Sequence, residues 1–199
     1  MCKKLPILVI ALVTLSLLTV GVGVASAQDE IAQQDVFRIN YFSNANVSGA
    51  PDATVRIDNP GVYYGNLCAM IYVFDNDQQL TECCGCVETH NGLRTLSVNK
   101  DLTSNPLTGV KSNNGVIKVV SSTPNSYPCD PTGNVYPTPN LRTWVTHIQN
   151  KVGSAFPVTE TESSDSLLGD SEFDALEAQC YFLNILGSGH GICTCGTGD

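Results

Sequence analysis

Basic side chains are scarce in this sequence. It has 10 Lys and Arg residues against 19 Asp and Glu residues, which gives a formal net charge of −9. Nucleic acids and anionic membrane surfaces are bound chiefly through Lys and Arg, so neither is expected as a partner. The excess of acid favours solubility, and it leaves open a surface that binds cations.

Recognisable catalytic motifs are also lacking. The sequence contains no Gly-x-Ser-x-Gly, no His-Glu-x-x-His and no phosphate-binding loop, and its three histidines lie far apart. Ser188 and His190 are close in the chain, but no carboxylate is placed to orient the histidine. We therefore assign no catalytic, cofactor-binding or metal-binding residue. A secreted enzyme of unknown class stays open as the weakest alternative.

The first 27 residues have the pattern of a secretory signal peptide. Lys3 and Lys4 precede a long apolar run, and Ala25-Ser26-Ala27 supplies the small residues of a cleavage site. Glycines near the end of the run argue against a membrane anchor. We expect cleavage after Ala27, no membrane attachment afterwards, and a location outside the cell or at its surface, with the periplasm as an alternative.

Cleavage would leave an even number of cysteines, which in an exported chain predicts disulfides rather than free thiols. The eight residues are Cys68, Cys83, Cys84, Cys86, Cys129, Cys180, Cys193 and Cys195. Their pairing cannot be derived from the sequence. A chain of this length can bury a core without crosslinks, so the bridges are expected to reinforce the fold.

Residues 65–86 hold the most apolar run and the densest cysteine cluster of the mature chain. Residues 67–74 are all apolar, which favours a strand that is buried on both faces. The cysteines that follow are expected to tie the end of this strand to the proline-rich segment around Cys129 or to the C-terminal cysteines. Residues 65–86 are thus predicted to be the structural centre.

Cys83-Cys84-Gly85-Cys86 contains the Cys-x-x-Cys spacing of redox proteins. Glu82 and Glu88 flank it, and nearby carboxylates raise a thiol pKa instead of lowering it, so structural disulfides are favoured over an oxidoreductase. A zinc site that combines this cluster with Cys193, Cys195 and a histidine (His90 or His190) is a further alternative. Its spacing matches no regular zinc pattern.

Five segments have the alternation or the β-branched and aromatic content of strands. They are residues 36–42, 54–58, 67–74, 93–98 and 115–121. Loops separate them and no helix is expected before residue 140, which predicts an antiparallel β-sandwich of immunoglobulin-like or Greek-key type. Residues 124–139 contain five prolines and are interpreted as an extended crossover held by a disulfide at Cys129.

Two short helices are expected near the C-terminus. Leu141, Trp144, Val145 and Ile148 have helical spacing, which predicts a helix over residues 141–149 with Trp144 in the core. Acidic residues 159–170 are expected to form a loop before a second helix, which would begin at Ser171 and end at Gly187 with Cys180 buried. The domain organisation is then a signal peptide at 1–27, a β-sandwich body at 28–139, and a helical, disulfide-linked cap of the same domain at 140–199.

Several loop residues are candidates for binding. The loops are residues 43–52 and 122–139, and the candidate contacts are Tyr63, Tyr64, Tyr127 and Tyr136. Asp75-Asn76-Asp77 resembles the opening of a calcium loop but lacks its glycine and glutamate, so a turn is expected. Four acids could bind calcium together, namely Glu160, Glu162, Asp165 and Asp170. The simpler interpretation of these acids is a solvated loop. Asn46-Val47-Ser48 is a glycosylation sequon.

The chain resembles an uncharacterised group of secreted, cysteine-rich acidobacterial proteins. The resembling segments are residues 67–75, 78–79, 82–86, 91–93, 105–107, 141–149, 187–189 and 193–195. The resemblance implies a Gram-negative exporter and supports a single cysteine framework. It implies no activity, cofactor or catalytic residue.

These observations favour a non-enzymatic extracellular structural or assembly protein, such as a subunit of a surface filament or matrix. The polar residues 28–34 could add as a strand to an open sheet edge of a neighbouring copy, so the chain itself is the first candidate partner. The alternative is an extracellular module that binds a carbohydrate such as a surface glycan, a cation, or another exported protein.

Overall fold

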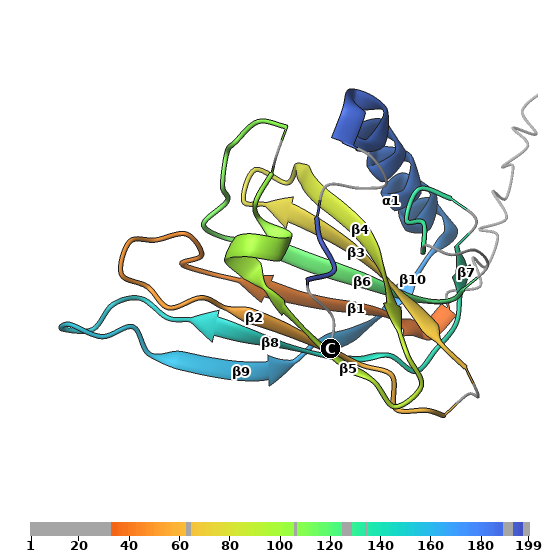
Figure 1. Cartoon of the computed structure of the whole chain (residues 1–199), viewed down its shortest axis with the longest axis horizontal. Helices are drawn as coiled ribbons and strands as arrows, with labels where there is room; N and C mark the ends of the chain where they lie inside the picture. Colours follow the sequence, from red (N-terminus) through yellow and green to blue (C-terminus); the bar gives the residue numbers. More distant parts are fainter. Residues whose placement is uncertain are drawn as a thin grey trace, which may run out of the picture. The chain divides into compact units, whose positions relative to one another are not determined.

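The computed structural model describes residues 33–62, 65–105, 107–124, 129–133, 135–188 and 193–196. The expected signal peptide, residues 1–27, lies outside the described residues. Two antiparallel sheets face each other (Figure 1). Sheet A has the order β10-β1-β6-β3-β4, with β7 paired to β6, and sheet B has the order β5-β2-β8-β9. The expectation of a mainly β, antiparallel, disulfide-linked sandwich is confirmed.

The strands and helices follow the chain in a simple order. The strands of sheet A are β1 (Gln33–Phe42), β3 (Leu67–Asp75), β4 (Leu80–Glu88), β6 (Gly115–Thr123), β7 (Tyr136–Pro137) and β10 (Ser164–Leu168). Those of sheet B are β2 (Thr54–Asp58), β5 (Leu93–Ser97), β8 (Arg142–Ile148) and β9 (Val158–Glu162). The helical segments are η1 (Val98–Leu102), α1 (Asp170–Leu183) and η2 (Asn184–Ser188).

All five expected strands occur, as β1, β2, β3, β5 and β6. Where their apolar and polar residues alternate, the reason is that one face of the strand is buried between the sheets. In β2, for example, Val55 and Ile57 are fully buried between the sheets, whereas Thr54, Arg56 and Asp58 face outward. β3 is buried along seven of its nine residues because it lies between β6 and β4 and is covered on both faces.

The cysteine cluster forms a strand of its own, β4, which the sequence did not predict. β4 pairs with β3 along its whole length and is the edge strand of sheet A. The hairpin turn between them is residues 75–79, where one carboxylate oxygen of Asp75 accepts hydrogen bonds from the backbone of Asp77 and Gln79. The prediction of a turn at Asp75-Asn76-Asp77 is confirmed.

Sheet A is buried on both faces, which creates two hydrophobic cores. The inner core lies between the sheets and includes Ile71, Leu96 and Val145. The outer core lies on the opposite face of sheet A, beside α1 (Figure 1). It includes Met70 and Tyr72 of β3 and Leu176 and Cys180 of α1. The continuous apolar run of β3 is explained because its side chains alternate between these two cores.

The predicted helix over residues 141–149 is wrong, because this segment is strand β8. Leu141, Val145 and Ile148 are buried as expected, but Thr143 and His147 are buried with them, which follows the two-residue repeat of a strand. Trp144 does not lie in the core. It is partly exposed on the outer face of sheet B, opposite Arg56 of β2.

The predicted loop over residues 159–170 is also wrong. β9 and β10 follow each other with Ser163 alone between them, and the chain passes there from sheet B to sheet A. Among the described residues after 140, helix is therefore confined to α1 and η2. α1 begins at Asp170, with Gly169 and not Ser171 at the N-cap, and it ends at Leu183 instead of continuing to Gly187.

Within the described part of the chain, no helix is both long enough and apolar enough to cross a membrane.

Position 85 in Cys83-Cys84-Gly85-Cys86 requires a glycine for a steric reason that can be tested. The side chain of an alanine at position 85 would collide with the backbone carbonyl of Cys129, which passes over the outer face of β4. We expect Gly85→Ala to destabilise the fold by roughly 1–3 kcal/mol, because a backbone segment must shift to make room. Thermal and urea unfolding with the disulfides intact would measure this change.

Gly133→Ala is the matched control, because the added methyl group meets nothing within 4 Å. Equal stabilities of the two variants would contradict the proposed close approach of Cys129 to β4.

Candidate functional site

The three cysteines of β4 point to both faces of sheet A. Successive side chains of a strand lie on opposite faces. Cys83 accordingly belongs to the outer core, and Cys84 and Cys86 belong to the inner core. Because of this alternation, the cluster must bond to segments on two sides of the sheet, and Cys83 cannot act together with Cys86.

Two disulfides hold the outer core. Cys83 bonds to Cys180, which joins β4 to α1, and Cys68 bonds to Cys129, which joins β3 to the proline-rich crossover. The expectations that a disulfide holds the crossover and that Cys180 bonds inward are both confirmed. α1 is thereby fixed against the edge of sheet A by a covalent bond as well as by the packing of Leu176.

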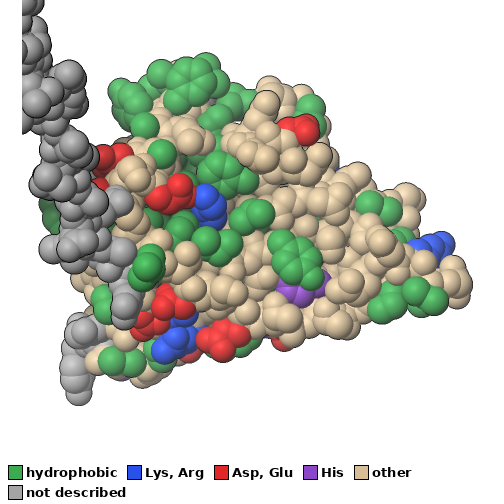
Figure 2. All heavy atoms as spheres, turned by 180° about the vertical axis from the view of Figure 1, so that it is seen from behind, with side chains coloured by type: hydrophobic (Ala, Val, Ile, Leu, Met, Phe, Trp, Pro, Cys, Tyr) green, Lys and Arg blue, Asp and Glu red, His purple; other side chains and the backbone are tan. Residues whose placement is uncertain are grey.

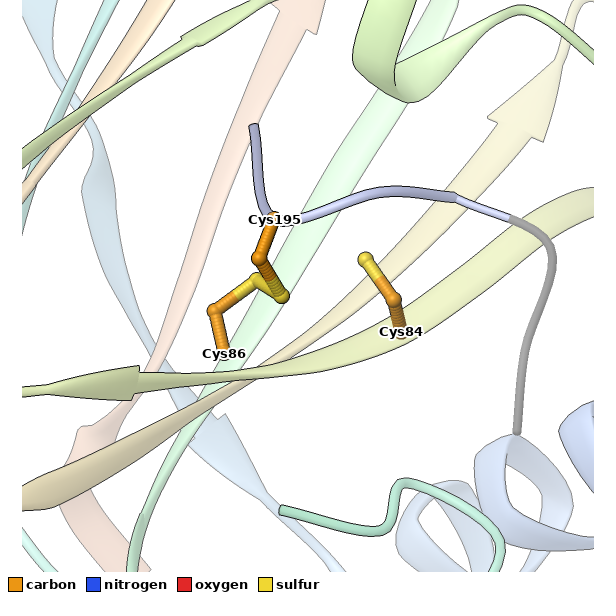
Figure 3. A group of neighbouring side chains, drawn as sticks. All are labelled: Cys84, Cys86 and Cys195. Atoms are coloured by element: carbon orange, nitrogen blue, oxygen red, sulfur yellow. A yellow bond between two sulfur atoms is a disulfide. The ribbon is translucent and has the colours of Figure 1, made fainter. Parts of the chain in front are cut away.

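Two further disulfides lie side by side on the inner face of β4. Cys84 bonds to Cys193 and Cys86 bonds to Cys195. Figure 3 shows Cys84 and Cys86 pointing from the same face of the strand toward the C-terminal segment. The prediction that the cluster is tied to Cys193 and Cys195 is confirmed. Cys129, the other expected partner of the cluster, bonds to β3 instead.

Residues 193–196, here called the tail, connect the edges of the two sheets. Arg94 of edge strand β5 donates hydrogen bonds to the carbonyl oxygens of Cys195 and Val87, both 2.7 Å long. The backbone N–H of Thr194 donates to the carbonyl of Asp101 in η1 at 3.0 Å. The disulfides attach the same tail to β4. The tail therefore covers the side of the sandwich where β4 and β5 are the outermost strands.

Two buried glutamates flank Cys84 and Cys86 on β4. Glu82, Cys84, Cys86 and Glu88 are all at even positions and share the inner face of β4. Burial raises the pKa of Glu82 to about 7, against the opposing effect of a hydrogen bond donated by the backbone of Asn105. Burial also raises the pKa of Glu88 to about 7, although Arg94 lies 2.7 Å away and acts to lower it.

The arrangement fits structural crosslinks better than redox or metal chemistry. Cys83 and Cys86 are not bonded to each other, and both are fully buried, whereas a redox pair needs an accessible thiolate. The sulfur atoms of Cys84, Cys86 and Cys195 lie within 4.8 Å of one another, which is close enough for a shared metal. All three are in disulfides, however, and metals bind the thiolate form.

A second feature is an apolar surface near the end of α1. It is formed by Leu80, Leu107, Val110, Phe182, Leu183 and Leu186, which come from β4, the loop after η1, α1 and η2. Figure 2 shows hydrophobic side chains gathered at this end of the molecule. Phe182 is 58% exposed and Val110 is 67% exposed. Two adjoining hollows of about 500 and 590 Å³ lie on this surface and share Leu80 and Leu183.

The sequence contains the reason why the helical side of this surface is uncharged, although Asp75 of β3 lines one of the two hollows. The first eight residues of α1 carry four acids, but no charged residue occurs from Ala178 to Ser188. Tyr181 and Ile185 are also more than half exposed on the neighbouring side of the helix. An apolar helix end that is not fully covered is unusual in a chain that is otherwise acidic.

The other candidates from the sequence do not form one site. Four of them lie outside the described residues, namely Tyr63, Tyr64, Tyr127 and His190, the histidine considered both beside Ser188 and as a metal ligand. Tyr136 is exposed on β7. The acids of residues 160–170 are spread over β9, β10 and the start of α1. His90 lies in the exposed turn before β5. Asn46 of the sequon uses its side-chain amide to bind Thr103 and Ser112.

The buried states of Glu82 and Glu88 and the apolar surface were not found from the sequence. Glu82, Cys84, Cys86 and Glu88 are spaced two residues apart. If the cluster is a strand, this spacing predicts that the two glutamates lie on the same face as Cys84 and Cys86. For the apolar surface the signal was the adjacent Tyr181, Phe182 and Leu183, because a single helix face cannot bury three successive residues.

Comparisons with models of known protein families, with curated proteins and with solved structures gave no match. The site is therefore interpreted from its own geometry.

The two inner disulfides should be partly redundant. Once Cys83–Cys180 is formed, either inner bridge closes a loop of about 15 residues, worth about 3 kcal/mol, and the second adds only a small loop. Replacing Cys86 and Cys195 by alanine should cost about 2 kcal/mol, and replacing all four cysteines about 5 kcal/mol. Urea unfolding measures both.

Replacement of Cys84 and Cys193 alone completes the cycle and should also cost about 2 kcal/mol. Strict additivity of the two paired replacements would show that the bridges act independently. Free-thiol titration of each oxidised variant should detect none, which verifies that the remaining cysteines keep their partners.

The buried glutamates predict that stability falls as the pH rises. The folded pKa of Glu82, about 7, lies above the ordinary value of 4.5, so folding favours the protonated form. Its contribution is present below pH 4.5 and is lost as the pH rises through 7. Glu82→Gln should reduce this loss between pH 4.5 and about 8 by on the order of 1–3 kcal/mol.

Urea unfolding across this pH range, with the disulfides intact, would test the effect. Glu160→Gln changes the same charge at an exposed ion pair with Arg56 and should leave the pH dependence nearly unchanged. Parallel pH profiles for the wild type and Glu82→Gln would contradict the buried, protonated state of Glu82.

Proposed function

We propose that the chain is a secreted, non-enzymatic structural or assembly protein that associates with copies of itself outside the cell. The observation that carries the proposal is the apolar surface at the end of α1. The disulfides support an oxidising environment, and the signal-like residues 1–27 support export to it. A surface filament or matrix is the setting that these features favour.

The apolar surface is held in a defined shape, which suits a permanent contact. The bridge Cys83–Cys180 fixes α1 to sheet A two residues before Phe182, and Leu80 extends from the same strand that carries Cys83. A rigid surface loses little conformational entropy on binding. Exposed aromatic and aliphatic side chains beside preformed hollows are typical of the centres of protein interfaces.

The charge distribution favours a second copy as the occupant. The protein is strongly acidic, so two copies repel each other through most surfaces. The segment from Ala178 to Ser188 has no charge, and the lining of the two hollows includes a single carboxylate, Asp75, so repulsion between two copies is weaker here than at the acidic first part of α1. Around a twofold axis, Phe182 of each copy could fill a hollow of the other, which gives a self-complementary interface and a closed dimer, the unit from which a filament or matrix would be built through a second contact.

Strand addition is a weaker route to assembly in this fold. β9 is the edge strand of sheet B. Pro157 and Ser163 form backbone hydrogen bonds to Gln149 and Thr143 on the β8 side. Because these bonds alternate along an antiparallel strand, the N–H and C=O groups of Glu160 and Glu162 point away from β8. This edge is open, but its two glutamates discourage pairing with another acidic chain. Residues 28–32 of the expected donor arm lie outside the described residues, and Gln33 begins β1.

Self-association can be tested on the oxidised mature protein by sedimentation over a wide concentration range. We expect a concentration-dependent oligomer, and we expect Phe182→Ser to raise its dissociation constant by roughly tenfold or more, because an interface aromatic is lost. Phe182 is 58% exposed, so the fold should tolerate the change. Circular dichroism would verify that the variant remains folded.

Tyr136→Ser is the matched control, since Tyr136 is 54% exposed on β7 and is not part of the apolar surface. A wild type that stays monomeric at the highest concentration would overturn the proposal. So would equal effects of the Phe182 and Tyr136 substitutions.

A further inference from the structure

A hollow of about 530 Å³ lies where the chain passes from sheet B to sheet A. β10 begins at Ser164, which pairs with Ile39, so Asn40, Tyr41 and Phe42 of β1 have no strand partner on that side. The hollow occupies the space beside this unpaired end. Its walls come from β1 and from Val116 of β6 on one side, and from β9 and β10 on the other, and Ile39 and Val116 make part of these walls apolar. It is separate from the disulfides and from the apolar surface.

The aromatic side chain of the hollow is held in a fixed orientation. Tyr41 is 49% exposed, and its ring stacks on His147 with 4.1 Å between the ring centroids and an interplanar angle of 24°. His147 is fully buried in β8, and its Nε2 lies 2.6 Å from the hydroxyl of Thr161. Burial lowers the pKa of His147, which favours a neutral ring for this stack. Tyr41 is therefore a preorganised, accessible aromatic ring.

The rest of the hollow is rich in hydrogen-bonding groups. Ser164 and Ser166 contribute hydroxyls, and Glu162 and Asp165 contribute carboxylates. Among the described residues, Glu162 forms no ion pair, so its carboxylate is available to accept hydrogen bonds. Asn40 is held in place at the base by hydrogen bonds to Thr161 and Ser163.

We propose that this hollow binds one unit of a neutral saccharide, with Tyr41 against the C–H face of the sugar ring and Glu162 as an acceptor of its hydroxyl protons. A sugar ring presents an apolar face and a rim of hydroxyl groups, which match an aromatic ring beside carboxylates and hydroxyls. The shallow, open form of the hollow suits a polysaccharide that continues beyond it.

The charges of the hollow argue against other ligand classes. Glu162 and Asp165 repel phosphate, sulfate and uronic acids. Arg38, which contacts Asp165 of the hollow, is buried and already ion-paired with Asp35 and Asp165. A metal ion would use the carboxylates but not the ring of Tyr41, and Asp165 is partly neutralised by Arg38 at 3.7 Å. A neutral saccharide uses both the ring and the free carboxylate.

The test is isothermal titration of the oxidised mature protein with neutral oligosaccharides, namely hexasaccharides of β-1,4-glucan, β-1,3-glucan and β-1,4-mannan, in the presence of a chelator. We expect at least one to bind, and we expect Tyr41→Ala to weaken binding by about tenfold or more, whereas Tyr41→Phe keeps most of it. Glu162→Gln should weaken binding by a smaller factor, because an amide still accepts a hydrogen bond.

Tyr136→Ala removes an equally exposed tyrosine outside the hollow and should bind as the wild type does. Failure of every oligosaccharide to bind would overturn the proposal, and so would binding that survives Tyr41→Ala. Thermal unfolding of each variant shows whether the fold is kept. Because Phe182 lies outside this hollow, Phe182→Ser should keep saccharide binding, so the result is independent of self-association.

Discussion

The alternation of side chains along one edge strand governs this fold. β4 places Cys83 on one face of sheet A and Cys84 with Cys86 on the other, so a single strand is bonded to two different segments of the C-terminal region. α1 must therefore lie on the outer face and the tail on the inner face. The order of cysteines in the sequence thus determines on which side of the sheet each C-terminal segment lies.

The two open sides of the sandwich are joined in different ways. On one side the chain itself crosses between the sheets at Ser163, where β9 ends and β10 begins. On the other side the tail joins β4 to β5 through disulfides and through Arg94. Glu82 and Glu88 are buried beside these crosslinks, at a cost in desolvation that the covalent bonds help to offset. Edge strands, which commonly invite pairing with other chains, are covered on this second side.

The sequence was sufficient for the architecture because β1, β2, β3, β5 and β6 have clear alternation or a continuous apolar run. It was misleading for β8, where Leu141, Val145 and Ile148 have the spacing of a helix face, although all three are buried in or directly before a strand in which the neighbours His147 and Ile148 are both buried. It was also misleading for β9 and β10, whose exposed acids carry little hydrophobic pattern. Their strand conformation comes from pairing with β8 and β1, which are distant in the chain.

The two surfaces proposed to bind partners arise from places where the fold is incomplete. β10 begins opposite Ile39 and does not pair with the last residues of β1, which leaves Tyr41 exposed over buried His147. At the other surface, Phe182 at the end of α1 and Leu186 of η2 are both more than half exposed. A helix that served only to complete the outer core would use Leu183, which packs against that core, but would not need the exposed Phe182 or an exposed Leu186 in η2. Exposed apolar residues at the end of a disulfide-linked helix lower solubility, and burial of these residues against a partner would explain their presence.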